Sequence, residues 1–146
     1  MKKFNTSDFG IIEYCESDII HFPKGIYGFE DQRDYVILHD SPKDELFFLQ
    51  SVEKANLHFV ILDPVIIDSN YKPIITDEDK MVITTENEEF RYLVIVAIKE
   101  KIEESVVNMK SPLVINLENR NAVQTILFDD KYDIRHPLFV KVEDGE

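Results

Sequence analysis

The amino-acid sequence predicts an all-β fold of mostly antiparallel strands, a small β-barrel-like single domain with one short helix. Three observations lead to this prediction. Many short segments are rich in Val, Ile, Phe and Tyr, turn-forming Asp, Asn, Ser, Pro and Gly separate them, and one segment carries the start signals of a helix. Closing the sheet as a barrel would leave no strand edge exposed.

The candidate strands, in chain order, are residues 10–14, 18–22, 35–39, 46–52, 58–62, 91–99, 112–117 and 122–128. The run Tyr92–Ile98 shows no alternation of apolar and polar residues and is rich in β-branched residues. We therefore expect a central strand that is covered on both faces. Between the last two strands, the segment Asn116–Asn121 predicts a hairpin loop in which asparagines adopt the left-handed backbone conformation.

The predicted helix begins at the sequence TDEDK. Thr76 is a suitable N-cap, and Asp77, Glu78 and Asp79 occupy the first turn, where the helix dipole favours anions. The residues EN and EE within the following segment 86–90 are interpreted as a solvated turn.

Length and composition indicate one domain, spanning residues 1–146. A chain of about 150 residues buries roughly 68–70% of its unfolded surface, so a core needs no disulfide. The single cysteine, Cys15, has no partner in the chain, which is typical of a reducing compartment. Neither an export signal nor an apolar run of about 20 residues is seen. We expect a cytoplasmic protein without membrane contact.

The stretch HFPKGIYGFED, His21–Asp31, contains two of the four glycines of the chain. Its spacing differs from that of loops that bind phosphate. Ile26, Tyr27 and Phe29 are too many apolar side chains for a short segment to leave fully in water. Two interpretations remain, a turn folded onto the core or a binding edge with partly exposed rings.

No catalytic, metal or cofactor site is predicted. The four histidines have no metal-ligand spacing, and the acidic neighbours of Cys15 would raise the pKa of its thiol rather than activate it. The acidic stretch at 77–79 lacks the rest of a calcium-binding loop. These patterns favour a protein that is not an enzyme.

The net charge is −13, from 16 basic and 29 acidic residues. Such a surface repels nucleic acid, because each phosphate contact needs a cation, and it attracts a basic partner. The alternative is that excess acid only keeps the protein soluble. The candidate partner-binding residues are Phe29, Glu30 and Asp31 in the glycine-containing stretch and Asp77, Glu78 and Asp79 at the helix start.

Several motifs in series carry a resemblance. FPKGIYGFED is followed by FFLQSVE, an apolar strand ending LDP, Tyr71, SPLVINLENRNAVQTIL and YDIRHPL. In order and spacing this set resembles the flagellar assembly factor FliW family over nearly the whole chain. The pair Ile26-Tyr27 replaces the usual leucine of the first motif. The matching positions are Phe22, Pro23, Gly25, Gly28, Phe29, Glu30, Gln50, Ser51, Ser111, Pro112, Asn116, Asn121, Ala122, Gln124, Tyr132, His136 and Pro137.

The resemblance implies a small antiparallel β-barrel-like fold and a regulator that is not an enzyme. Proteins of this family bind the RNA-binding translational repressor CsrA, which they antagonise allosterically, and they also bind flagellin. The resemblance therefore implies coupling of flagellin mRNA translation to flagellin export, with no direct contact to nucleic acid.

Two other functions stay open from the residues alone. One is a small-ligand-binding β-barrel protein without catalytic activity, which would need a large empty apolar interior. The other is an enzyme with paired carboxylates that acts on a sugar, which would need two acids facing each other across a cleft. In the absence of a heptad pattern or a long apolar edge we expect a monomer.

Overall fold

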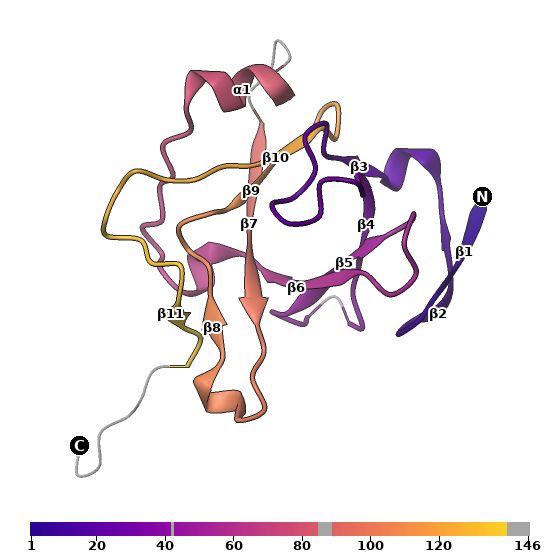
Figure 1. The fold of residues 1–146 in the computed structure, drawn as a ribbon, viewed down its shortest axis with the longest axis horizontal. Coiled ribbons are helices and arrows are strands. Elements are labelled where there is room, and N and C mark those ends of the chain that lie inside the picture. Colours follow the sequence, from indigo (N-terminus) through magenta and orange to yellow (C-terminus); the bar gives the residue numbers. More distant parts are fainter. Residues whose placement is uncertain (42, 85–88, 140–146) are drawn as a thin grey trace.

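A computed structural model describes residues 1–41, 43–84 and 89–139, and every strand pair in it is antiparallel (Figure 1). The strands are β1 (Lys2–Thr6), β2 (Gly10–Tyr14), β3 (Ile20–His21), β4 (Asp34–Leu38), β5 (Phe47–Ser51), β6 (His58–Leu62), β7 (Phe90–Ala97), β8 (Val106–Val107), β9 (Leu113–Asn116), β10 (Ala122–Gln124) and β11 (His136–Pro137). Helix α1 (Asp77–Ile83) is the single α-helix of the described residues. Short 3₁₀ turns span Glu16–Asp18, Pro64–Ile66 and Ile102–Glu104.

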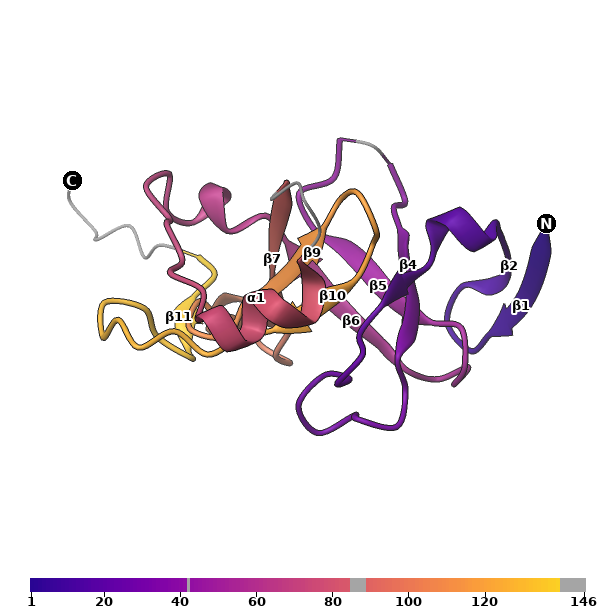
Figure 2. The ribbon, with the colours of Figure 1, turned by 90° about the horizontal axis from the view of Figure 1, so that it is seen from above.

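The strands form two sheets. Within the described residues, strands β1 and β2 pair only with each other, and this hairpin lies at the opposite end of the molecule from β11 (Figures 1 and 2). The remaining nine strands form one sheet with the main order β10-β9-β7-β6-β5-β4-β3, and β8 joins β7 to β11.

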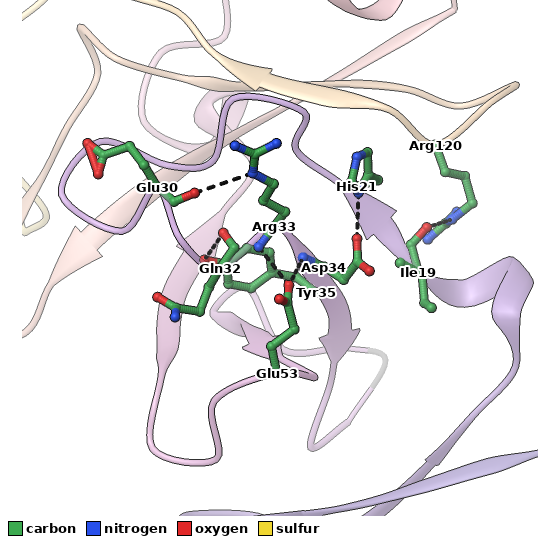
Figure 3. A network of polar contacts seen from close by, with 9 residues as sticks. All are labelled: Ile19, His21, Glu30, Gln32, Arg33, Asp34, Tyr35, Glu53 and Arg120. Atoms are coloured by element: carbon green, nitrogen blue, oxygen red, sulfur yellow. Dashed lines mark hydrogen bonds and ion pairs between the residues drawn. The ribbon is translucent and has the colours of Figure 1, made fainter.

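The two ends of the main sheet meet at a seam between β3 and β10. His21 forms a parallel bridge with Asn121, and its backbone N–H donates to the carbonyl of Arg120 at 3.0 Å. The Arg120 guanidinium reaches across the same seam and donates to the carbonyls of Ile19 at 3.3 Å and Asp18 at 3.0 Å. Figure 3 shows the contact between Arg120 and Ile19. The fold class is confirmed as mostly antiparallel, barrel-like and with one short helix.

The interior of this barrel-like sheet is filled by side chains. Its buried apolar residues include Ile20, Phe22, Tyr35, Leu49, Ile61, Leu93, Leu113 and Ile115, none more than 1% exposed. On β7, Leu93 belongs to this cluster, whereas the next residue, Val94, packs with Leu62, Tyr71 and Met109 on the other face. The prediction of a central strand covered on both faces is confirmed.

Some strand boundaries differ from the prediction. The strand expected at 18–22 is reduced to β3 because residues 16–18 form a 3₁₀ turn. The strand expected at 122–128 ends at Gln124, and the N–H of Thr125 then bonds to the carbonyl of Pro112 at 3.1 Å. Strands β1, β8 and β11 were not predicted, because β1 is polar and the other two have two residues each.

The hairpin loop between β9 and β10 is confirmed, but the prediction that asparagines take the left-handed conformation is wrong. Arg120 has φ +60° instead, the single such non-glycine residue in the described part of the chain. The side chains of Asn116 and Asn119 both donate to the carbonyl of Ile83, at 2.8 and 3.2 Å. These amides thus join the hairpin loop to the C-terminal end of α1, which explains why asparagine occurs there.

Helix α1 is confirmed where it was expected. The hydroxyl of Thr76 accepts the N–H of Asp79 at 3.2 Å, and the three acidic residues Asp77, Glu78 and Asp79 lie in the first turn. Most of the acidic turn expected at 86–90 lies outside the described residues. In the part of the chain that is described, the helices are too short and too polar to cross a membrane.

Candidate functional site

The loop between β3 and β4 is folded onto the core by Phe22 and Ile26, which are 0% and 1% exposed. Gly25 allows the loop to turn back so that its backbone lies close to that of Glu30. Its φ is +71°, and a Cβ there would lie 2.5 Å from the Cα of Glu30, so a larger residue does not fit. The next aromatic residue, Tyr27, is 58% exposed and points away from the core. The interpretation as a turn folded onto the core is therefore confirmed, and Tyr27 is an exposed ring of this turn; that the turn is a binding edge stays a prediction.

The outer side of the loop is held against β10. The N–H of Tyr27 donates to Oε1 of Gln124 at 3.0 Å, and Nε2 of Gln124 donates to the carbonyl of Ser111 at 3.3 Å. The carboxylate of Glu30 accepts the N–H of Gly28 at 2.9 Å. Because Gln124 is buried and bonded on both sides, the loop, β10 and the segment before β9 keep fixed relative positions.

A polar network on the other side of the loop fixes its return into β4 (Figure 3). Nδ1 of His21 lies 2.5 Å from the carboxylate of Asp34, and the carboxylate of Glu53 accepts the N–H groups of Arg33 and Asp34. The buried hydroxyl of Tyr35 donates to the carbonyl of Gln32 at 3.3 Å. Burial raises the pKa of Tyr35 well above its ordinary value, so this donor stays protonated. The network is structural.

A groove lies between this loop, helix α1 and the segment that follows β10. Its larger hollow has a volume of about 410 Å³, and a smaller hollow of about 150 Å³ shares Thr76 and Phe128 with it. We call the two together the α1 groove. The larger hollow is lined by Lys24, Gly25, Tyr27, Glu30, Thr76, Glu78, Asp79, Val123, Gln124, Ile126 and Phe128, and the smaller by Lys72, Ile74, Thr76, Leu127, Phe128, Asp129 and Tyr132.

The two hollows differ in character. Among its described lining residues, the larger one carries the carboxylates of Glu30, Glu78 and Asp79 and one cation, Lys24. We call it the acidic half. The smaller one is dominated by Ile74 and Phe128, each 83% exposed, and we call it the apolar half. A concave surface with an apolar part and an acidic part is suited to a protein segment rather than to a catalytic step.

The candidate partner-binding residues divide between groove and surroundings. Glu30, Glu78 and Asp79 come together in the acidic half, although Glu30 is far from the other two in the sequence. Asp31 and Asp77 are exposed but do not line the groove. Phe29 is 39% exposed and packs edge-to-face on Phe59, with ring centroids 5.2 Å apart.

Sequence reasoning missed the apolar lining of the groove, chiefly Ile74, Ile126 and Phe128. Their signal was weak, since each lies in a short apolar run that could equally belong to a strand. Only after β10 ends at Gln124 does the chain leave Ile126 and Phe128 facing solvent, 46% and 83% exposed.

A metal centre finds no support in the part of the chain that is described. No three side chains of His, Cys, Asp and Glu come together there in a way that could hold an ion. The carboxylate of Asp79 instead accepts the hydroxyl of Thr125 at 2.5 Å. This contact joins α1 to the residue that follows β10.

Comparison with known proteins identifies the family. The family model described as FliW protein matches residues 3–138. The flagellar assembly factor FliW of Caldanaerobacter subterraneus subsp. tengcongensis is 40% identical over 145 residues, covering 98% of this chain and 97% of that protein. The protein of the same name from Thermoanaerobacter pseudethanolicus is 36% identical, with the same coverage.

A solved structure agrees with the sequence relatives. The crystal structure of a flagellar assembly factor FliW superposes with a TM-score of 0.85 at 29% sequence identity, covering 96% of this chain and 99% of that one. The resemblance in the sequence motifs is thereby confirmed for fold and sequence alike. The chain belongs to the FliW family.

Proposed function

We propose that this protein is a flagellar assembly factor that binds and allosterically antagonises the translational repressor CsrA and also binds flagellin. It acts in the cytoplasm as a monomeric, non-catalytic domain spanning residues 1–146. Its membership of the FliW family, whose relatives are named flagellar assembly factors, supports a role in assembly. Free flagellin and CsrA compete for the protein, so unexported flagellin releases CsrA and stops flagellin translation.

The observation that carries the proposal is the convergence of acidic groups on one groove. Glu30 and the pair Glu78 and Asp79 come from distant segments, yet they line the same hollow in a chain of net charge −13. An RNA-binding protein must present cations to phosphates. Glu30, Glu78 and Asp79 therefore form a surface suited to such a partner, whereas Phe29, Asp31 and Asp77 lie outside the groove.

Electrostatics also gives a physical route to antagonism without blocking the RNA site. When this anionic protein docks on CsrA beside the RNA site, it raises the free energy of an approaching RNA. The effect reaches about one screening length, roughly 8 Å at physiological ionic strength. Binding of this kind leaves CsrA itself folded and intact. RNA release then depends on the charge that the protein brings, in addition to any change of shape.

The filled interior argues against the alternative of a small-ligand-binding barrel. Phe22, Leu49 and Leu113 occupy the space that a ligand would need, and all three are fully buried. The α1 groove lies outside the barrel-like sheet, and its lining includes the exposed side chains of Tyr27, Ile74 and Phe128. A packed interior with an external groove fits a protein-binding module better.

The proposal is tested by capture of partners from cytoplasmic extract, with and without added purified flagellin. We expect an RNA-binding protein to be retained without added flagellin and to be displaced by it. Retention of neither protein would refute the proposed function.

The electrostatic part is tested by the salt dependence of CsrA release from its RNA. We expect the antagonism to weaken when ionic strength rises from about 0.05 to about 0.5 M, because the screening length falls about threefold. Neutralising Glu30, Glu78 and Asp79 to amides should flatten this dependence. An antagonism that is indifferent to both salt and these charges would show that shape change alone releases the RNA.

A further inference from the structure

We propose that the α1 groove receives one segment of the RNA-binding partner. That segment places a lysine or arginine in the acidic half and an apolar side chain in the apolar half. The inference rests on the proposed function and deepens it, because it assigns one surface to one partner and names the side chains that hold it.

The apolar half has the properties of an uncovered interface. Ile74 and Phe128 are each 83% exposed, although the residues beside them, Ile75 and Leu127, are 8% and 2% exposed. Tyr132, which is 4% exposed, also lines this hollow. When a partner removes two large apolar side chains at one hollow from water, the free energy falls and binding is favoured.

The acidic half selects a cation. Its three carboxylates face one lysine, and two of the three already accept hydrogen bonds, Glu30 from the N–H of Gly28 and Asp79 from Thr125. Glu78 is exposed, and its carboxylate has no hydrogen bond or ion pair with the described residues. An incoming guanidinium or ammonium group therefore finds Glu78 ready to bind, with Asp79 and Glu30 adding to the local negative potential.

One segment can occupy both halves because the two hollows share Thr76 and Phe128. Because Phe128 lines both hollows, an apolar group that packs against Phe128 in the apolar half lies next to the acidic half. A second copy of this chain is a poor occupant, since each copy carries −13. Nucleic acid is disfavoured by the same charge.

The groove walls are held in place before any partner arrives. The side chain of Gln124 bonds both the N–H of Tyr27 in the loop and the carbonyl of Ser111. The bond from Thr125 to Asp79 joins α1 to the segment that follows β10. The two amides that bond the carbonyl of Ile83 fix the other end of α1. A preformed groove loses little conformational entropy on binding, which favours a short segment as its ligand.

Two matched pairs of variants of the full chain test the inference by titration with purified full-length CsrA. Phe128→Ala is compared with Met81→Ala, because Met81 is 82% exposed but lies outside the groove. Glu78→Gln is compared with Asp77→Asn, its neighbour in the same helical turn, which does not line the groove.

We expect Phe128→Ala to weaken CsrA binding about tenfold, as for an aromatic residue near an interface centre. Glu78→Gln should weaken it about two- to fivefold at low salt and less at high salt. Met81→Ala and Asp77→Asn should stay within about twofold of the original chain. Thermal melting of each variant checks that all four substitutions leave the fold intact.

The outcomes separate this inference from the proposed function. If the original chain does not bind CsrA, the proposed function fails. If it binds CsrA and both groove variants bind as tightly as their controls, the groove assignment alone is overturned. Loss of flagellin binding with normal CsrA binding would also overturn it, because the groove would then belong to flagellin.

Discussion

The barrel interior and the α1 groove are both lined by large apolar side chains, but the fold covers one set and leaves the other exposed. Leu49 and Ile61 are fully buried between strands, whereas Ile74 and Phe128 are each 83% exposed. Apolar residues of the interior are there because burial stabilises the chain. Ile74 and Phe128 contribute little to the isolated fold, because most of each side chain stays in water, and their exposure at one hollow agrees with the proposal that a partner covers them.

The largest effect that separates the two regions is expected from truncating one residue in each. Leu49→Ala removes a fully buried side chain from the interior cluster and should lower the free energy of unfolding by about 2–5 kcal/mol. Phe128→Ala should change it by less than about 0.5 kcal/mol, because the ring is already in water. Urea unfolding measures both. A large loss for Phe128→Ala would mean that the groove is part of the folding core.

The interior was predictable from the sequence, and the groove was not. The apolar, β-branched run 92–98 indicates a buried central strand from its composition alone. The groove depends on three segments, near residues 27–30, 74–79 and 123–128, that meet only in the folded chain. The local sequence pattern drew attention to the acidic segments 29–31 and 77–79. It did not show that Glu30 lies in the same hollow as Glu78.

The seam between β3 and β10 also shows that local sequence does not predict a tertiary contact. Asparagine has the higher intrinsic preference for the left-handed conformation, so the loop 116–121 was expected to use it. The structure uses Arg120 there, because its guanidinium reaches the carbonyls of Asp18 and Ile19 across the seam between β3 and β10. A tertiary contact outweighs a local propensity, and no short-range signal reveals it.

The loop between β3 and β4 borders both regions, and its two glycines sharpen the contrast. Gly28→Ala should cost about 1–2 kcal/mol, since its φ of +88° is strained for alanine but a Cβ there meets no neighbouring atom. Gly25→Ala should cost more, because the backbone of Glu30 must also move. Gly25→Ala should weaken CsrA binding as well, since Gly25 and Glu30 both line the groove. Equal losses of stability for the two variants would show that conformation alone decides at both positions.

The smallest effect concerns a buried tyrosine behind the groove. Tyr71 packs against Tyr132, with ring centroids 4.7 Å apart, and its hydroxyl donates to the carbonyl of Met109 at 2.8 Å. Burial, with Tyr132 as a second cause, raises the pKa of Tyr71 well above its ordinary value. Because the folded-state pKa is the higher one, the stabilisation is complete below the unfolded pKa of about 10 and is lost as pH rises beyond it.

Replacing this hydroxyl therefore has opposite consequences at neutral and at alkaline pH. At neutral pH, Tyr71→Phe should lower the free energy of unfolding by about 1 kcal/mol, because the carbonyl of Met109 loses its donor. Above about pH 10 the variant should lose stability less steeply than the original chain, since one buried group no longer has to ionise. Tyr35, whose pKa burial also raises, keeps part of the alkaline loss in place. Unfolding curves in urea from neutral to alkaline pH measure both slopes, and parallel curves would mean that Tyr71 ionises without cost in the folded chain.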